Sequence, residues 1–443
     1  MAADVLVVGG GVAGLETVAA LRALARSRVA ITLVARSTRF EPRAMSVTAP
    51  FEERPEAVVS LPDLARSIPF DLRVGELDFV DQEQHTVQLR DGERLFYDVL
   101  VVVTGAVARP AFPGAITFGG RDEAAAVTEA LDNAEQLAFV APTASNWTLP
   151  LYELALISAL ARPHVSLAVV TAETAPLWIF GAAAGDAIRE LFAERGIGLL
   201  TGVRVLAAAD GMLELDGAEP VSADRAIALP YLAGPAIDGL PHDEHGFLPV
   251  DAHGAVVGAT DVYAAGDVTA FPLKQGGLAT QQADAVAEAV AATTGASVTP
   301  RPFAPVVRGL LLTGGAPLYL RSDGTHGTSH RLADAAVSAN ALWWPPVKVA
   351  GRYLASLLGP DEPLGPGGGL LHDLRASADA ERPEPENAAE LALMLARESA
   401  DRGDYVEALH TLDAAQSLSG GELPTEWERT RTLWEARANP PAW

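Results

Sequence analysis

The stretch that decides the fold reads ADVLVVGGGVAGLE and runs from Ala3 to Glu16. Its first part, Asp4–Val8, is short, apolar and rich in β-branched residues, which is typical of a strand buried on both faces of a parallel sheet. An Ala- and Leu-rich segment with helical spacing follows to residue 26. The GxGxxG pattern therefore stands between a strand and a helix, which is the context that gives it meaning.

Each glycine of this pattern has a separate physical role. Gly9 allows the tight turn, Gly11 lets a pyrophosphate approach the backbone, and Gly14 lets the helix pack close to the strand. The helix N-terminus adds free N–H groups and partial positive charge for phosphates. Glycine turns also serve ordinary packing, but with both flanks in place we interpret this one as a dinucleotide-binding site.

Composition narrows the class of protein. A chain of 443 residues has room for two or three domains. Its net charge of -25 argues against nucleic acid and anionic membrane surfaces as partners. No apolar run is long enough for a bilayer span, and the first residues, MAADVLVV, lack the basic region and cleavage site of a leader peptide. The sequence predicts a soluble, cytoplasmic protein, for which we do not expect membrane contact.

The chain contains no cysteine. This excludes a redox disulfide, a thiolate nucleophile, an iron–sulfur cluster and a thiolate zinc site. Two close histidine pairs, His242 with His245 and His326 with His330, lack the HExxH pattern of a metal-binding helix. We interpret them as solvated loop histidines and expect no metal site, so the chemistry should come from a bound cofactor.

Strand ends in the first unit carry the other candidate contacts. After the second strand, Ala35 takes the place of the carboxylate that usually holds a ribose, and Arg36 either contacts an adenosine or is a solvated arginine. A later buried strand ends in Thr104-Gly105, which either passes close to the cofactor or is a plain strand-to-loop transition. Another ends in Asp267, at the edge where open α/β sheets bind ligands.

A second unit of alternating strands and helices begins near residue 121. Its strands and helices are expected at 136–141, 152–162, 165–171 and 185–195. The loop Pro142–Pro150 after its first strand contains no glycine, so a pyrophosphate cannot approach its backbone in the usual way. Glu173, after the next strand, either holds a nicotinamide ribose or is a solvated loop residue.

The C-terminal part carries weaker signals. Residues 303–320 predict strands, and Trp343-Trp344 precede an amphipathic helix predicted at 347–358. We favour packing of this helix within the molecule or against a second subunit over a membrane foot, because the protein is strongly acidic. Residues 387–418 predict two helices, and one pattern among them is similar to half of a tetratricopeptide-type pair. Residues 361–443 contain 17 acidic and 7 basic residues.

Four motifs stand together in one order. They are GGGVAGLE at 9–16, FEP at 40–42, VVVTGA at 101–106 and VYAAGD at 262–267. This order resembles the FAD-dependent flavoproteins with two dinucleotide-binding domains, the pyridine nucleotide-disulfide oxidoreductase superfamily, over about residues 3–355. Within it the chain looks most like the branch of sulfide:quinone reductases and type II NADH dehydrogenases, and its composition is similar to a bacterial group of such flavoproteins.

The resemblance implies a set of FAD contacts but no catalytic residue. Gly9, Gly11 and Gly14 would hold the pyrophosphate. The other implied contacts are Arg36 at the adenosine end, Pro42 and Arg43 beside the cofactor, Leu77 by the adenine, Thr104 and Gly105 near the crevice, Gly266 and Asp267 at the ribityl chain or pyrophosphate, and Lys274, Gln275, Gly276, Gly277 and Leu278 at the isoalloxazine. Glu16 is either a flavin-side carboxylate or a residue that interacts favourably with the helix dipole.

The implied architecture is α/β, with two Rossmann-like domains of which the second interrupts the first. A C-terminal α+β and helical segment and a helical-hairpin tail follow. The expected divisions are 1–120 and 241–300 for the FAD-binding domain, 121–240 for a degenerate NAD(P)H-type domain, 301–358 for an interface segment, 359–386 for a linker and 387–443 for the tail.

The implied function is that of a soluble FAD-dependent oxidoreductase without cysteine chemistry. It would pass electrons between an unidentified donor and a quinone-like or protein acceptor. NAD(P)H use is doubtful because the second glycine fingerprint is absent, so a dehydrogenase with an atypical nucleotide loop is the first alternative. The second is a flavoprotein scaffold whose tail docks a protein partner. The sequence leaves open whether the protein forms a homodimer.

Overall fold

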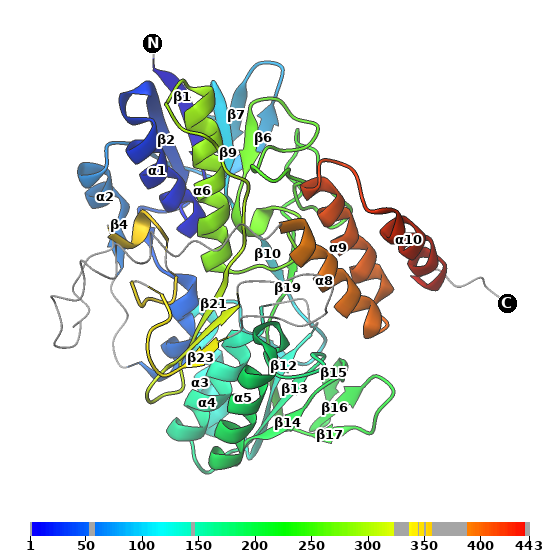
Figure 1. The fold of residues 1–443 in the computed structure, drawn as a ribbon. Coiled ribbons are helices and arrows are strands. Elements are labelled where there is room, and N and C mark those ends of the chain that lie inside the picture. The colour runs from blue at the N-terminus through cyan, green and yellow to red at the C-terminus, as the bar shows by residue number, and fades with distance from the viewer. Residues whose placement is uncertain are drawn as a thin grey trace.

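The computed structural model describes residues 2–52, 58–142, 147–322, 336–343, 345–349, 351–356 and 388–438. Two five-stranded parallel sheets form its frame, one above the other in Figure 1. The predicted pair of α/β units is confirmed. The first sheet has the order β20-β9-β1-β2-β5, with β1 (Ala3–Val8), β2 (Val29–Ala35), β5 (Asp71–Val74), β9 (Val99–Val102) and β20 (Val262–Ala264).

Both faces of the first sheet are covered. Helices α1 (Val12–Leu24) and α6 (Gly276–Thr293) pack side by side on one face. A small antiparallel sheet lies on the other, and its Val87 and Leu89 are fully buried against Leu6 and Val8 of β1. Its strands are β6 (Leu77–Asp81), β7 (Thr86–Leu89) and β8 (Arg94–Phe96). Burial on both faces explains why β1 is a continuous apolar run.

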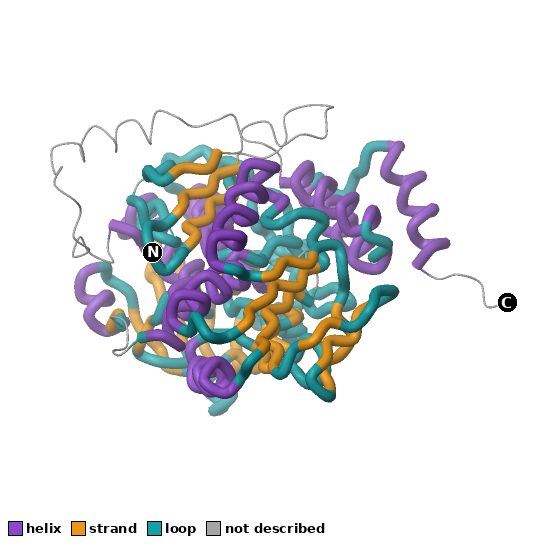
Figure 2. The backbone as a smooth tube through the Cα atoms, turned by 90° about the horizontal axis from the view of Figure 1, so that it is seen from below, coloured by secondary structure: helices purple, strands orange, loops and turns teal. Residues whose placement is uncertain are grey.

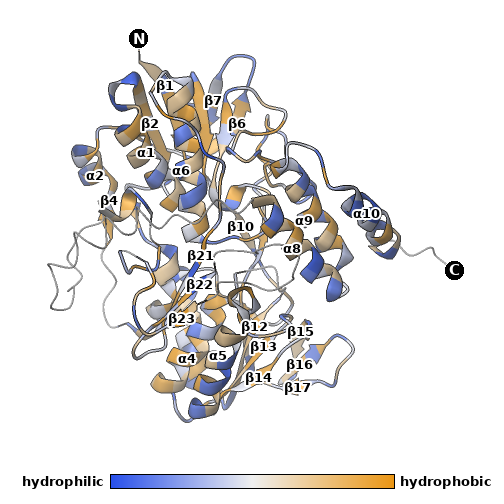
Figure 3. Cartoon of the chain, viewed as in Figure 1, coloured by the Kyte–Doolittle hydropathy of each residue, from blue (hydrophilic) through white to orange (hydrophobic). Residues whose placement is uncertain are grey.

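The second sheet has the order β11-β18-β12-β13-β14 and is inserted between strands of the first. Its strands are β11 (Ile116–Thr117), β12 (Gln136–Ala141), β13 (Ser166–Thr171), β14 (Gly198–Leu200) and β18 (Arg225–Ala228), with helices α3 (Ala124–Asn133), α4 (Leu149–Ala161) and α5 (Gly181–Arg195). A meander follows it, formed by β15 (Val205–Ala209), β16 (Met212–Leu215) and β17 (Val221–Ser222). Figure 3 shows hydrophobic residues gathered on strands β12, β13 and β14 of the second sheet.

An antiparallel pair marks the crossing between the two units. It joins β10 (Val107–Arg109), where the chain leaves the first unit, to β19 (Tyr231–Ala233), where it returns. The remaining short elements are η1 (Arg26–Arg28), β3 (Arg39–Phe40), η2 (Arg43–Phe51), β4 (Val59–Ser60), α2 (Leu61–Ser67), η3 (Arg121–Glu123), η4 (Trp178–Phe180), η5 (Gly266–Val268) and η6 (Leu354–Ser356).

The prediction of a helix at 347–358 is wrong for the described residues. The chain forms an antiparallel sheet of β21 (Val307–Leu311), β22 (Leu318–Ser322) and β23 (Ala336–Ser338), and then a strap, the described residues of 345–356, in which only η6 is helical. The N–H groups of Tyr353 and Leu354 donate to Glu16 on α1, at 2.7 and 2.8 Å, instead of to the carbonyls of a preceding turn. A tertiary contact thus overrides the helical period.

Trp343 packs within the molecule, which is one of the two placements that the sequence favours over a membrane foot. Its indole N–H donates to the carbonyl of Val347 at 3.0 Å, and its ring meets Tyr319 edge to face at 5.1 Å. Trp344, the linker and the pair His326 and His330 lie outside the described residues. Within the described ranges, every helix is too short or too polar to cross a bilayer.

The tail holds one helix more than the sequence pattern predicts. Helices α8 (Ala388–Asp401) and α9 (Tyr405–Leu418) form the expected hairpin, and α10 (Thr425–Ala438) packs on α9. Figures 1 and 2 place α10 at the outer edge of the molecule. The hairpin, by contrast, is part of the main core, because Ala388, Leu391 and Leu395 are buried in the same cluster as the second sheet.

A buried carboxyl pair fastens the strap to the first unit. Glu16 is fully buried, and Asp284 of α6 lies beside it. Burial raises the pKa of Glu16, and burial together with repulsion by Glu16 raises that of Asp284 well above its usual range. One carboxyl therefore holds a proton in the folded protein, because two buried carboxylates at close range repel each other. Glu16 is thus a structural clasp on α1.

This pair should make the protein less stable as the pH rises. A carboxyl whose pKa is raised on folding contributes stability below its unfolded pKa, and loses it as the pH rises through the folded pKa. Asp284→Asn should remove that loss and make the decline of stability with rising pH clearly less steep. Denaturant unfolding at each pH measures it. Asp186→Asn on exposed α5 is the matched control, and an equally steep decline in Asp284→Asn would contradict the assignment.

Candidate functional site

A cavity of about 1130 Å³ lies between the two units. It is larger than ordinary ligand pockets, which hold roughly 300–1,000 Å³. One end is formed by the glycine turn after β1, the end of β9 and the start of α6, and the other by the start of α4, β21 and the strap. The cavity therefore lies at the carboxyl ends of the first sheet, where open α/β sheets bind ligands.

The glycine turn has the geometry that its sequence predicts. Gly9 has φ +130°, and a Cβ there would lie 2.2 Å from the carbonyl oxygen of Val103. A Cβ at Gly14 would lie 1.9 Å from the carbonyl oxygen of Gly9, so only glycine lets α1 approach the turn this closely. At Gly11 a Cβ would meet nothing within 4 Å. The turn thus leaves open space at the position where a pyrophosphate would approach.

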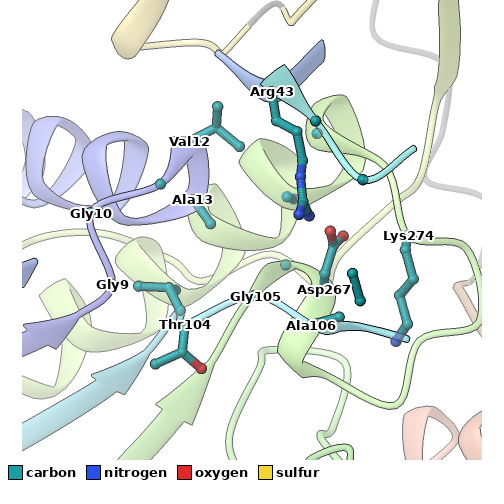
Figure 4. A pocket seen from close by; sticks show the side chains of 18 of the residues that line it. Gly9, Gly10, Val12, Ala13, Arg43, Thr104, Gly105, Ala106, Asp267 and Lys274 are labelled. Atoms are coloured by element: carbon teal, nitrogen blue, oxygen red, sulfur yellow. The ribbon is translucent and has the colours of Figure 1, made fainter. Parts of the chain in front are cut away.

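Polar groups without internal partners face this space. The hydroxyl of Thr104 is buried on the cavity wall and, within the part of the chain that the structure describes, has no hydrogen-bond partner. Asp267 follows β20 on η5, and Figure 4 shows the side chain of Arg43 reaching toward it. Burial raises the pKa of Asp267, while the charges of Lys274 and Arg43 oppose that rise.

Lys274 lies on the same wall, beside Asp267 (Figure 4). Its side chain is 8% exposed, and its Nζ donates to the carbonyl of Thr269 and stands 3.7 Å from the ring centre of Phe247. Burial lowers the pKa of Lys274 to about 8, although the charges of Asp267, Asp243 and Glu407 act in the opposite direction. The wall therefore carries a compact cation of reduced proton affinity.

These features fit a bound dinucleotide. An open glycine turn at the start of α1 suits a pyrophosphate. A hydroxyl without a partner and a half-buried carboxylate on the same cavity wall suit the hydrogen-bonding groups of a polyol chain. Thirteen of the predicted contacts line the cavity: Gly9, Gly11, Arg36, Pro42, Arg43, Leu77, Thr104, Gly105, Gly266, Asp267, Lys274, Gln275 and Gly276.

Three of the predicted contacts do not line it. Gly14 lies beneath the turn, and Gly277 and Leu278 lie one turn into α6, where Leu278 is 1% exposed in the core. The amide of Gln275 is also engaged: its Oε1 accepts from the N–H of Leu278 at 2.7 Å and its Nε2 donates to the carbonyl of Arg308 at 2.9 Å. The start of α6 is therefore capped by its own chain.

Glu173 lies in the protein interior, so its interpretation as a solvated loop residue is wrong. It is 1% exposed and accepts hydrogen bonds from Tyr152 at 2.6 Å, Thr148 at 3.0 Å and Thr171 at 3.2 Å. Burial raises its pKa to about 7, against the effect of these hydrogen bonds. Among the described residues, these hydroxyl groups occupy the carboxylate oxygens that a ribose would need.

The start of α4 also differs from the prediction. The helix begins at Leu149 rather than at residue 152, with Pro150 in its first turn, where a missing N–H is tolerated. Trp147 stands beside it, edge to face with Phe180 at 5.8 Å, and residues 143–146 of the loop lie outside the described ranges. A phosphate at this helix start would find one N–H fewer and an aromatic ring.

Sequence reasoning missed the cavity residues of the strap. Lys348 lies on the cavity wall, and its Nζ contacts both carboxylate oxygens of the fully buried Glu153, at 2.6 and 2.5 Å. Glu153 also accepts from the N–H of Leu312 at 2.9 Å. The only local signal was a glutamate in an apolar helix, because its partners lie 159 and 195 residues further along the chain.

Comparison with known proteins places the chain in a family. The profile of the pyridine nucleotide-disulphide oxidoreductases matches residues 3–293. Among solved structures, the sulfide:quinone oxidoreductase of the hyperthermophilic bacterium Aquifex aeolicus is similar with a TM-score of 0.66 and 20% identity, covering 76% of this chain and 87% of that one. A chain of the covalent putidaredoxin reductase–putidaredoxin complex gives a TM-score of 0.57 and 18% identity, covering 86% and 99%.

A third similar structure is the ferredoxin reductase from Rhodopseudomonas palustris, with a TM-score of 0.55 and 19% identity, covering 72% of this chain and 81% of that one. At these identities the likeness concerns the fold. No curated protein sequence matches the chain. The family match spans more than half of the residues and includes both parallel sheets. The chain belongs to the pyridine nucleotide-disulphide oxidoreductase family and is an FAD-dependent oxidoreductase.

Proposed function

We propose that this enzyme takes its electrons from a donor other than NADH or NADPH and passes them to a quinone-like or protein acceptor. The observation that carries the proposal is the closed carboxyl end of the second sheet. In a doubly wound domain a dinucleotide lies across that end, with its ribose on a carboxylate and its pyrophosphate on a helix N-terminus. Here the carboxylate of Glu173 is enclosed by three hydroxyl groups of the protein, and Pro150 removes one N–H from the start of α4.

The tail hairpin supports this reading, because it covers the same end of the sheet. Glu398 near the end of α8 accepts a hydrogen bond of 2.9 Å from Thr174, the residue after Glu173. Arg402, one turn further on, pairs with Glu398 at 3.2 Å, and its charge acts on Glu173. In Figure 1, α8 and α9 stand beside β10 and β19 and above β12 and β13.

The hairpin is also tied to the first unit. His410 of α9 bonds to Asp243 at 2.8 Å, and its ring stacks on Phe247 at 6.1 Å. Ala414 of α9 is buried with Phe247 and Ala270. The hairpin thus spans the junction between the two units, where a second dinucleotide would otherwise lie.

Because the chain contains no cysteine, it has no thiol of its own that could react with the donor or the acceptor. FAD, when bound, supplies the transfer of one or two electrons. Among the similar structures are a sulfide:quinone oxidoreductase and a reductase joined to its redox protein. These two proteins motivate the two acceptor classes for this chain.

We propose specific roles for the cavity residues. Gly9 shapes the turn, its own N–H being donated to the carbonyl of Val34 at 2.8 Å, and Gly11 presents its backbone to the pyrophosphate. Thr104 and Asp267 accept or donate hydrogen bonds along the polyol chain, and Arg43 balances the charge of Asp267. The Lys348 and Glu153 pair holds the strap against the far end of the cavity, which limits the access of water. The domain divisions expected from the sequence remain part of this proposal.

Asp267→Ala should bind FAD at least about tenfold more weakly, because a hydrogen bond of an ionised group is worth about 1.5–3 kcal/mol. The measurement is FAD dissociation from the purified protein by fluorescence, with Asp267→Asn alongside to separate hydrogen bonding from charge. Asp186→Ala on exposed α5 should bind as the wild type does. An unchanged affinity in Asp267→Ala would place the cofactor elsewhere in the cavity.

The donor class is tested by anaerobic reduction of the bound flavin. We expect neither NADH nor NADPH to bleach its absorbance within minutes, whereas dithionite reduces it fully. Bleaching by either nucleotide would overturn the proposal in favour of a dehydrogenase with an atypical nucleotide loop. A shift of the flavin spectrum on addition of a reduced quinone analogue, without nucleotide, would support a quinone-like redox partner.

A further inference from the structure

The chain contains 32 basic residues, and only Lys274 and Lys348 are lysines. Lysine is ordinarily among the commonest residues of a soluble protein. Arginine therefore serves at every other cationic position of the chain. The two lysines are 74 residues apart in the sequence, yet both line the cavity between the two units.

The chemistry of the two side chains suggests why lysine is retained there. An arginine keeps its proton at all physiological pH values, whereas a lysine amine loses its proton readily when it is buried. A position that must exchange a proton can therefore hold lysine but not arginine. A position that needs only a fixed charge can hold either.

The two lysines differ in their surroundings. Lys348 bonds to both oxygens of Glu153, which is an arrangement that the guanidinium of arginine also satisfies. Lys274 takes part in none of the ion pairs among the described residues: its Nζ meets a backbone carbonyl and the face of Phe247. It is thus a buried amine held by neutral groups, on the wall of the cofactor cavity.

Charged and titratable groups nevertheless surround Lys274 on every side. Asp267 lies beside it on η5 and is itself approached by Arg43 of η2. Beyond Phe247 lie His410, hydrogen-bonded to Asp243, and His245, whose ring meets that of His410 at 4.3 Å. Glu407 of α9 acts on Lys274 through its charge. Of these groups, Lys274, Asp267 and Arg43 line the cavity.

We propose that Lys274 binds a proton when the bound cofactor is reduced and releases it when the cofactor is reoxidised. The proposal rests on the proposed function only in that FAD occupies this cavity. Two electrons from the donor add negative charge to the cavity, which favours the charged form of a nearby amine. One proton then passes from solvent to the neutral Nζ of Lys274. When the acceptor removes the two electrons, that proton returns to solvent.

This role predicts a particular dependence of the flavin midpoint potential on pH. Burial lowers the pKa of Lys274 to about 8, so above about that pH its reduction-linked proton is taken up from solvent. The potential should then fall more steeply, by about 30 mV per pH unit, which corresponds to tenfold per proton for a two-electron couple. Spectroelectrochemical titration of the holoenzyme between pH 6 and pH 10 measures this slope.

Lys274→Arg is the decisive variant, because it keeps the positive charge and removes the exchangeable proton. We expect it to lose the additional slope while its potential below pH 7 stays near that of the wild type. Lys348→Arg, on the same cavity wall, should keep the additional slope and serves as the matched control. A slope that persists in Lys274→Arg would overturn the proposal, and so would its loss in Lys348→Arg alone.

A second measurement keeps the proposal testable if Lys274→Arg retains no FAD. With ¹³C-labelled lysine, the full chain gives side-chain signals from two residues only, which Lys348→Arg assigns by elimination. The Lys274 signal of the oxidised protein should titrate near pH 8, and its midpoint should rise on reduction by dithionite. An unchanged midpoint would overturn the proposal. Bleaching by NADH would contradict the proposed donor class but leave this titration interpretable.

Discussion

The close approach of the first helix to the glycine turn is the constraint on which the rest of the structure depends. Because a Cβ at Gly14 would lie 1.9 Å from the carbonyl of Gly9, α1 sits directly against the turn. That position carries Glu16 into the interior, where it accepts the N–H groups of Tyr353 and Leu354. The strap is thereby drawn across to Glu153, and Lys348 comes to the cavity wall. One glycine thus sets both the cofactor end and the strap end of the cavity.

The second unit retains a nucleotide-binding architecture whose binding groups serve packing instead. A buried carboxylate is costly unless hydrogen bonds satisfy it. Glu173 receives three from hydroxyl groups, two of them at the start of α4, where a phosphate would bind in a nucleotide domain. The same contacts that stabilise this carboxylate therefore occupy the group that would hold a ribose. Thr174 then provides the adjoining contact for α8.

The parts of the structure that follow from local sequence were predictable. Buried strands such as β1, β9 and β12 are continuous apolar runs, and the glycine turn follows from spacing alone. Most predicted FAD contacts come to one cavity because the carboxyl ends of parallel strands share an edge. The strap was not predictable, because its helical period is overridden by Glu16, more than 300 residues earlier. Glu173 is enclosed by side chains whose convergence no local pattern records.

The tail hairpin and the buried Lys274 are linked through the electrostatics of the cavity wall. A protein with a net charge of -25 places acidic residues over its surface, and the tail brings Glu407 and His410 close to the cofactor wall. Lys274 and His410 both contact the ring of Phe247, at 3.7 and 6.1 Å from its centre. The charge on Lys274 therefore depends on residues of the tail as well as on Asp267. Displacement of the hairpin would expose the second sheet and, at the same time, remove negative charge that favours the protonated amine. In this fold the tail is an electrostatic component of the cofactor site.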